Sequence, residues 1–373
     1  MKITSAARHI WRKQGHVLFV FMILISYVSY ILARHNGNPL AFVRVGIVYN
    51  APLAIHAADI YGYDGQFAYH IALYPLTAAP YLDVPAYRYQ RILYPLTARL
   101  FSLGQATALP WVLIGLNIAA LTYSTYLMGL MLAQYHYNRW YAVLAALFVG
   151  QLTSLRLDLT EPFSLMFALL AIYTFEQQKP RQAALSLAAS LLSKETALAF
   201  VGGYLFYYLL QRQWRLLVET ALISLTPLAI LQFILWLNFG TIGLRSGGMG
   251  TTGFSWLPFG SILAFDLTTP ATLFTVIIVL APLILIPSLG LSLILLRNFS
   301  QGQISPLAFI VLLHLIMMAT LPFSTYVDLP AITRLASGLI IATLAFATLT
   351  QNSRLLRLTP LWFSSTFLLI FIG

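Results

Sequence analysis

The sequence predicts an all-α integral membrane protein, a polytopic transmembrane bundle of about 10–11 membrane helices. Hydrophobic residues make up 60% of the 373-residue chain and charged residues only 8%. A soluble domain carries roughly a quarter charged residues. The apolar runs are about 15 to 25 residues long and lack the two-residue alternation of barrel strands. Because lipid offers the backbone no hydrogen bonds, such runs predict spanning helices.

The stretch from about 182 to 211 differs from the other apolar runs. It is interrupted by Ser193-Lys194-Glu195-Thr196, so each half is short for a span of about 20 residues. Basic residues flank both ends, which predicts a re-entrant or broken pair of helices that enters and leaves on the same side. Such a pair is tolerated where it is buried in protein or lines a cavity. The remaining spans are predicted at about 16–33, 108–133, 139–155, 162–177, 215–238, 270–297, 304–322, 334–350 and 358–373.

The basic residues predict the orientation of the chain. With the N-terminus in the cytoplasm, twelve Lys and Arg lie inside, eight lie outside, and Lys194 lies in the membrane region. This bias favours a cytoplasmic N-terminus and accounts for the net charge of +11 without a nucleic-acid partner. The basic segment 1–15 precedes a first span with no small-residue cleavage site, which predicts a retained anchor. The chain has no cysteine, which excludes disulfides and thiolate metal sites.

A single transmembrane domain, 1–373, is predicted to carry two long extracytoplasmic loops. The first, 34–110, is rich in tyrosine and contains apolar stretches at 67–76 and 92–103 that are too short to span. Tyrosine is favoured at the membrane surface, so these stretches predict interfacial helices. The second loop, 239–268, contains a glycine-rich run and is predicted to be mobile.

The first candidate for chemistry is the segment Tyr61–Phe67 in the first loop. Asp64 lies directly before an apolar stretch, where a carboxylate is placed to accept a proton from a sugar or lipid hydroxyl as general base. Tyr63 and Gln66 beside it are candidate substrate-binding residues. The alternative is structural, with Asp64 as a helix N-cap and Gly65 permitting the turn.

Two arginines follow in the same loop. Arg88 and Arg91 are three residues apart and share one face of a helix. Their planar guanidinium groups suit a phosphate or diphosphate, because the fork pairs bidentately with its oxygens. Tyr87 beside them is a third candidate ligand. The alternatives are contact with lipid headgroups or pairing with Asp83.

A very short outer turn between two spans holds Arg156, Asp158 and Glu161. They are candidates for binding a donor, an acceptor or a divalent cation. Two carboxylates are few for a cation that takes six or more oxygens, so no cofactor is assigned. The alternative is again structural, because Thr160 is placed to cap a helix with Pro162 in its first turn and Glu161 at its positive end.

Ionisable residues at membrane depth are costly and point to function. Lys194 and Glu195 lie at the break in the predicted helix pair. They are expected either to pair with each other or to bind substrate, with Lys194 meeting a phosphate. Arg334, in a late outer loop with Asp328, is a further candidate phosphate ligand. His314 in the preceding span is interpreted as a core residue.

These motifs resemble bacterial multi-spanning glycosyltransferases of the GT-C superfamily. The resemblance covers residues 61–95 in motif and the rest of the chain in topology. It implies a cytoplasmic N-terminus in the bacterial inner membrane, interfacial helices in a long first loop and a site at the extracytoplasmic face. The residues that carry it are Asp64-Gly65-Gln66-Phe67, His70-Ile71-Ala72 and Tyr87-Arg88-Tyr89-Gln90-Arg91-Ile92-Leu93-Tyr94-Pro95.

The resemblance implies transfer of a sugar from a polyprenyl-phosphate-type lipid to an acceptor hydroxyl, with inversion at the anomeric carbon. Asp64 is then the general base, and Arg88, Arg91 and Lys194 stabilise the departing phosphate. The implied partners are the lipid-linked donor, a glycan or lipid acceptor, and membrane lipids. Two other functions remain open. One is a transporter or flippase for a lipid-linked substrate, which also uses broken helices and intramembrane charges. The other is a non-catalytic subunit of surface-polymer assembly.

Overall fold

The computed structural model describes residues 5–50 and 60–371, with side chains at 14–50 and 60–370. Within these ranges the regular structure is helical, apart from one isolated β-bridge between Val45 and Gly62. Five of the described helices are long and apolar enough to cross a membrane, which makes the chain an integral membrane protein. They are Gln14–Arg34, Leu109–Gln134, Trp214–Phe239, Pro270–Ser300 and Leu329–Leu349.

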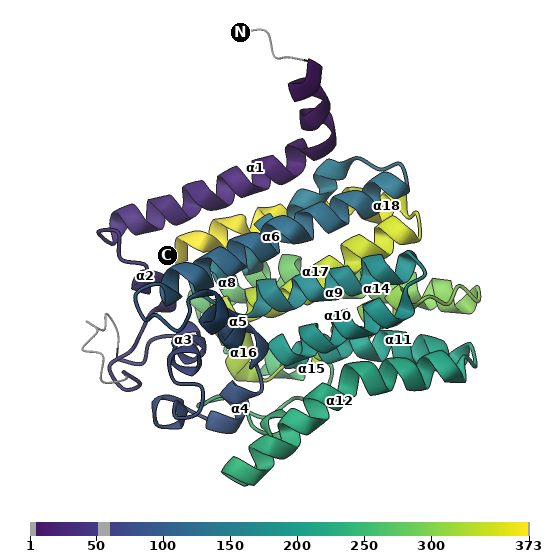
Figure 1. The fold of residues 1–373 in the computed structure, drawn as a ribbon. Helices are drawn as coiled ribbons and strands as arrows, with labels where there is room; N and C mark the ends of the chain where they lie inside the picture. Colours follow the sequence, from purple (N-terminus) through teal and green to yellow (C-terminus); the bar gives the residue numbers. More distant parts are fainter. Residues whose placement is uncertain (1–4, 51–59, 372–373) are drawn as a thin grey trace.

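The long helices lie side by side in one bundle, and the short helices α2 to α5 gather at one end of it (Figure 1). We call this end the loop end. The α-helices are α1 Ser5–Arg34, α2 Leu40–Val43, α3 Gly65–Leu73, α4 Pro85–Tyr89, α5 Leu93–Phe101, α6 Leu109–Gln134, α7 Leu144–Leu147, α8 Val149–Arg156, α9 Glu161–Glu176, α10 Pro180–Ser193, α11 Leu198–Leu210, α12 Trp214–Phe239, α13 Pro270–Phe274, α14 Ile286–Ser300, α15 Pro306–Thr320, α16 Phe323–Val327, α17 Leu329–Leu349 and α18 Ser353–Leu358. Short 3₁₀ helices are Ala79–Tyr81, Arg139–Val143, Glu195–Ala197, Gly243–Arg245 and Gly260–Ala264, with a longer one at Thr359–Phe371, and Thr275–Leu285 is π-helical.

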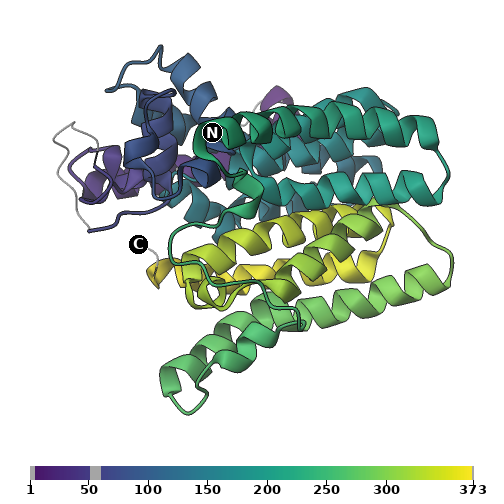
Figure 2. The same ribbon diagram turned by 90° about the horizontal axis from the view of Figure 1, so that it is seen from below.

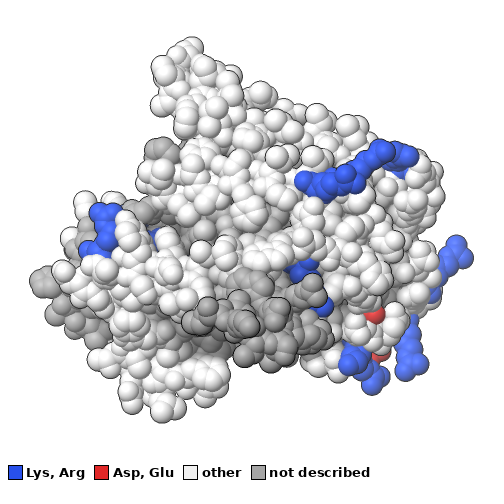
Figure 3. Space-filling view, turned by 90° about the horizontal axis from the view of Figure 1, so that it is seen from above, with Lys and Arg blue, Asp and Glu red and all other residues white. Residues whose placement is uncertain are grey.

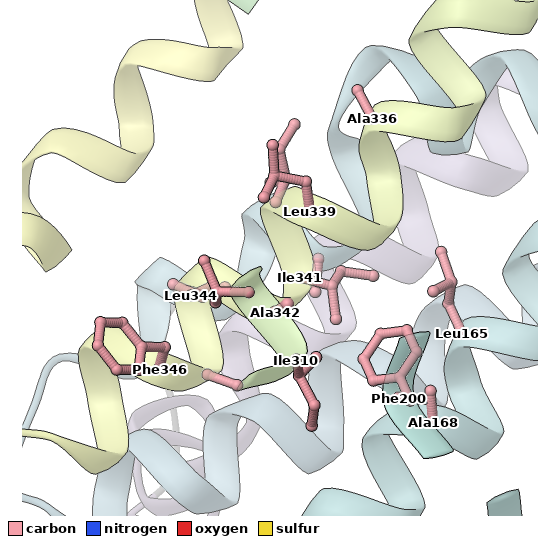
Figure 4. Packing of buried hydrophobic residues seen from close by; sticks show 14 of the residues in the cluster. Leu165, Ala168, Phe200, Ile310, Ala336, Leu339, Ile341, Ala342, Leu344 and Phe346 are labelled. Carbon is pink, nitrogen blue, oxygen red and sulfur yellow. The ribbon is translucent and has the colours of Figure 1, made fainter. Parts of the chain in front are cut away.

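Helix α17 is the centre of the bundle. In its most apolar 18-residue stretch 83% of the residues are buried, whereas the corresponding share for α12 is 28%. It packs against α8 and α15, and Figure 4 shows its Leu339, Ile341 and Leu344 in one cluster with Phe200 of α11 and Ile310 of α15. A helix that is apolar on every side belongs in the interior of a bundle. Neighbouring helices therefore hold α17 in position. They also determine where the polar residues in its first turns lie.

The predicted spans appear as helices, with two differences in shape. The span predicted at 139–155 is broken at Phe148, whose extended backbone separates α7 from α8. The amide of Gln151 donates to the carbonyl of Ala145 across this break (3.4 Å) and replaces part of the lost backbone bonding. The span predicted at 270–297 contains a π-helical segment around Pro282, because proline has no N–H to donate to the helix.

The prediction of a broken helix pair is confirmed. Helix α10 ends at Ser193, Lys194 is extended (ψ 133°), and α11 begins after a single 3₁₀ turn. Residues 179–182 at the start of the pair line a shared surface hollow with Arg215, Leu216 and Glu219 of α12, which follows the pair, so both outer ends lie on the same side. The break itself lies toward the loop end, where Glu195 pairs with Arg91 of the first loop and Lys194 pairs with Glu161 at the start of α9.

The first loop is more deeply packed than the sequence predicted. The two apolar stretches do form short helices, α3 and α5. However, the residues of α3 from Gly65 to Ala72 are all buried, so α3 lies inside the protein and not at its surface. Helix α5 does present an apolar face outward, at Leu96, Leu100 and Phe101. Residues 51–59 of this loop lie outside the described part of the chain.

The loop between α12 and α13 crosses the bundle on its way to the green helices at the lower edge of Figure 2. The backbone N–H of Met249 donates to Asp83 of the first loop (3.1 Å), and Thr252 exchanges hydrogen bonds with Ser324 of α16. The loop therefore connects the first loop to the segment before α17.

We expect Gly150→Ala to destabilise the bundle. A Cβ at Gly150 would lie 2.0 Å from the carbonyl oxygen of Thr333, so α8 and α17 would have to separate. Overpacking of this kind costs about 1–3 kcal/mol. The matched control is Gly115→Ala in α6, where no atom lies within 4 Å of the added carbon. Unfolding temperatures in one detergent test this expectation, and equal values for the two variants would contradict it.

Candidate active site

The backbone before α3 is held in place by close approaches between chain segments. A Cβ at Gly65 would lie 2.1 Å from the carbonyl oxygen of Leu157, so the start of α3 touches the turn between α8 and α9. Gln66 is buried, and its side chain accepts from the N–H of Gly46 (2.9 Å) and donates to the carbonyl of Tyr61 (2.7 Å). The side-chain amide of Gln66, a candidate substrate ligand, thus bonds to the backbone and holds the loop around Asp64 in place.

Asp64 lies between two guanidinium groups. Its Oδ1 is 3.0 Å from Nη2 of Arg88, and its Oδ2 is 2.8 Å from Nη2 of Arg334. Its side chain makes no capping hydrogen bond to α3, so the capping alternative is wrong. Burial favours the neutral acid, but Arg88, Arg334 and Arg91 outweigh it and hold the pKa of Asp64 well below its usual range. Asp64 is therefore a carboxylate with a cation on each oxygen.

The two arginines of the first loop face different acids. Arg88 makes a bidentate pair with Asp83, with both bonds at 2.7 Å, and its guanidinium lies 4.2 Å from the ring centre of Phe67. Arg91 makes a bidentate pair with Glu195, at 2.9 and 2.6 Å. Pairing of Arg88 with Asp83, one of the alternatives considered above, is confirmed.

Tyr87 and Tyr63 flank these arginines. The hydroxyl of Tyr87 accepts from Arg91, whose guanidinium lies over the Tyr87 ring at 4.4 Å. Tyr63 donates to Asp328 (3.1 Å), and its ring lies 5.4 Å from the guanidinium of Arg334. Both tyrosines therefore limit where the arginines can turn.

Lys194 and Glu195 do not pair with each other, contrary to one alternative. Lys194 instead lies 2.6 Å from Glu161, and both side chains are at most 4% exposed. Glu195 binds Arg91, as described above. The backbone of Lys194 is extended, and successive side chains of an extended chain point to opposite sides. Lys194 and Glu195 therefore contact different partners. The break between α10 and α11 is thereby tied to α9 on one side and to the first loop on the other.

Arg334 lies inside α17, whereas the sequence predicted it in an outer loop. Pro330 in the first turn starts the helix earlier than the apolar run suggested. The Nε atom of Arg334 lies 3.6 Å from Oε1 of Glu161, which is beyond hydrogen-bond distance. Neither Nε nor Nη1 of Arg334 has a hydrogen-bond partner. Arg334 thus faces both Asp64 and Glu161.

Asp158 is fully buried in the turn between α8 and α9, in a left-handed conformation (φ 52°). Its Oδ1 is 3.5 Å from the hydroxyl of Tyr94, which also accepts from Asn117 of α6 (2.9 Å). Burial raises the pKa of Asp158 well above its usual range, since no cation neutralises it. Sequence reasoning did not assign Tyr94 or Asn117 to the site, although a polar residue within a span is a signal of this kind.

A small cavity lies among these residues, and its charged lining is Asp64, Arg88, Arg91, Asp158, Glu161 and Arg334. Its free space is about 20 Å³, little more than one water molecule needs. Several buried oxygen atoms at its wall lack hydrogen-bond partners: Oδ2 of Asp158, Oγ1 of Thr160 and Oε2 of Glu161. Thr160 does not cap α9 with its side chain, so that alternative is also wrong. Unsatisfied acceptors beside cations suit a ligand with both hydroxyl and acidic groups.

Arg156 stands apart from this group. It donates to the backbone carbonyl of Ala41 (2.8 Å), and its guanidinium lies 5.9 Å from the ring centre of Phe42. It connects α8 to α2. In the part of the chain that the structure describes, no three His, Cys, Asp or Glu side chains gather in a way that would hold a metal ion.

We expect Lys194→Met to destabilise the protein strongly. The change leaves the carboxylate of Glu161 buried without its nearest cation, and breaking a buried pair in this way costs about 3–5 kcal/mol. Adding Glu161→Gln should restore much of the loss, because no unpaired charge then remains. Thermal unfolding of the two single variants and the double variant measures this coupling. Additive effects would mean that the two side chains do not act as a pair.

No protein-family model matches the chain, and neither does any curated protein sequence or solved structure.

Proposed function

We propose that the chain is a membrane glycosyltransferase that moves a sugar from a polyprenyl-phosphate-type lipid to an acceptor hydroxyl. The observation that carries this proposal is that one cavity at the loop end is lined by an ionised carboxylate, Asp64, and by three arginines. Sugar transfer needs a group that takes the hydroxyl proton and positive charge for the departing phosphate. The motif resemblance of residues 61–95 to GT-C enzymes supports the same reading.

The reaction has a simple balance. The acceptor oxygen attacks the anomeric carbon, and the bond from that carbon to the phosphate oxygen breaks. The phosphate leaves with the bonding electrons, and the hydroxyl proton passes to Asp64. Attack opposite the leaving group inverts the anomeric centre. Arg88, Arg91 and Arg334 stabilise the charge that grows on the phosphate, which is where fixed cations accelerate such a step most.

The unpaired oxygens on the other wall give the sugar a place to bind. Asp158, Thr160 and Glu161 each have an oxygen without a partner, and sugar hydroxyls, which both donate and accept, can satisfy such atoms. Because the cavity now holds little more than a water, the sugar must displace side chains or the loop 246–253 to enter. Movement of this loop breaks the hydrogen bond from the backbone N–H of Met249 to the carboxylate of Asp83.

The distribution of charge favours a site at the extracytoplasmic face. Figure 3 shows most of the visible Lys and Arg side chains toward the end of the bundle opposite the loop end. Lys179, Arg181 and Arg215 lie at that opposite end. Short basic connectors mark the cytoplasmic side, so the loop end faces outward, in the bacterial inner membrane.

A transporter for a lipid-linked substrate is the competing function. The buried pair of Lys194 and Glu161 lies at a helix break, a feature that transporters also use. A transporter needs its charges to serve access from both sides of the membrane. In the described part of this chain the buried ion pairs gather at the loop end, which favours the enzyme.

We expect Asp64→Asn to abolish sugar transfer while the protein stays folded. The amide keeps the shape of the side chain but cannot take the hydroxyl proton. The measurement is sugar transfer in liposomes from a panel of polyprenyl-phosphate sugars, with the product read by mass spectrometry. Asp266→Asn, at an exposed loop carboxylate that bonds only to nearby threonines, is the control and should retain full activity.

Full activity of Asp64→Asn would remove the carboxylate from the mechanism. Transfer of the sugar-lipid across the membrane, without a new glycosidic bond, would instead identify a transporter.

A further inference from the structure

The charged residues around the cavity form one connected set, which we call the charge cluster. It holds four cations and four carboxylates: Arg88, Arg91, Lys194 and Arg334, with Asp64, Asp83, Glu161 and Glu195. Asp158, which also lines the cavity, forms no ion pair within the described residues, and burial favours its neutral form. The cluster is therefore electrically balanced before any substrate binds.

Three of the four cations have an acid of their own. Arg88 is paired bidentately with Asp83, Arg91 is paired bidentately with Glu195, and Lys194 lies 2.6 Å from Glu161. Bidentate arginine–carboxylate pairs are among the strongest in proteins. A new anion at these cations would compete with a carboxylate that already neutralises their charge.

Arg334 is different. It makes one short contact, from Nη2 to Asp64 (2.8 Å), and Asp64 also has Arg88. Its Nη1 and Nε are buried without hydrogen-bond partners, and buried donors of this kind cost free energy until a ligand fills them. Within the charge cluster, Arg334 is thus the cation that has donors to offer at the least cost.

We propose that Arg334 is the anchor for the donor phosphate, and that the site is built for a lipid monophosphate rather than a lipid diphosphate. This inference rests on the proposed function and narrows its substrate class. A sugar joined to a lipid through one phosphate brings a single negative charge, which the free donors of Arg334 match. A diphosphate linkage brings a second charge, for which the balanced cluster holds no free cation and which would face Asp64 and Glu161.

Phosphate binding at Arg334 also has a consequence for the base. Arg334 and Arg88 each contact one oxygen of Asp64, and both cations lower the pKa of this carboxyl and so weaken it as a base. A phosphate that draws Arg334 away from Oδ2 raises the pKa of Asp64 again. Donor binding then prepares the base, whereas Arg88 stays with Asp83.

The test compares binding of undecaprenyl phosphate glucose and undecaprenyl diphosphate glucose to the full chain in nanodiscs, by native mass spectrometry. The two diesters carry the same sugar and lipid and differ by one phosphate and one negative charge, whereas an undecaprenyl phosphate without its sugar would itself carry close to two charges. We expect the monophosphate to bind about tenfold tighter or more. Arg334→Gln should weaken monophosphate binding by about tenfold or more, because it removes charge-assisted hydrogen bonds. Arg181→Gln, at an exposed arginine at the opposite end of the bundle, should leave binding unchanged.

The outcomes separate this inference from the proposed function. Tighter binding of the diphosphate by wild-type protein would overturn the inference without any variant, and so would unchanged binding by folded Arg334→Gln. Sugar transfer from diphosphate donors alone would keep the glycosyltransferase and overturn the monophosphate assignment. Monophosphate binding through Arg334 with no transfer from any donor would keep the phosphate site and overturn the glycosyltransferase.

Discussion

A charge that is buried in a membrane protein must find its counter-charge inside the protein, and this constraint organises the loop end of the bundle. The pair between Lys194 and Glu161 joins the break after α10 to the start of α9. The pair between Arg91 and Glu195 joins the same break to the first loop. Leaving any one of these groups alone in an apolar interior would cost several kcal/mol. The break, the first loop and α17 are therefore held together by charge, while the rest of the bundle is held by apolar packing.

Close backbone contact provides the second half of this arrangement. Gly65 allows the start of α3 to touch the carbonyl of Leu157, and Gly150 allows α8 to touch α17. The first contact places Asp64 beside the turn between α8 and α9, which holds Asp158. The second contact places Arg334 of α17 where it can contact Asp64. The fit is tight enough that one added carbon at either glycine meets a backbone oxygen. A site of this kind holds its charged groups in position before substrate arrives, which is what electrostatic catalysis requires.

The sequence predicted the all-helical membrane class and the broken helix pair, because both follow from composition and from the length of apolar runs. It also singled out cluster residues as candidates for the site, Lys194 and Glu195 because charge at membrane depth is costly and the others for the chemistry of their side chains in outer loops and turns: Asp64, Arg88, Arg91, Glu161 and Arg334. It could not predict their pairing, since Arg91 and Glu195 are 104 residues apart and charge alone does not choose between acids. The break at Phe148 was missed because the apolar run continues through this residue, without a proline or a charge to mark the extended backbone. Asp83 was considered only as a partner for Arg88, although it also receives the N–H of Met249.

The small volume of the cavity can be understood from the same charge balance. Each carboxylate of the cluster contacts a cation, and the cavity has little more than the volume of one water molecule free without substrate. An incoming phosphate changes this balance, because it competes with Asp64 for Arg334 and supplies the partner that Nη1 and Nε lack. The free energy that those two donors gain offsets the loss of the contact with Asp64. Binding and opening are thereby coupled through one guanidinium group, and a neutral sugar without the phosphate would gain nothing from that exchange.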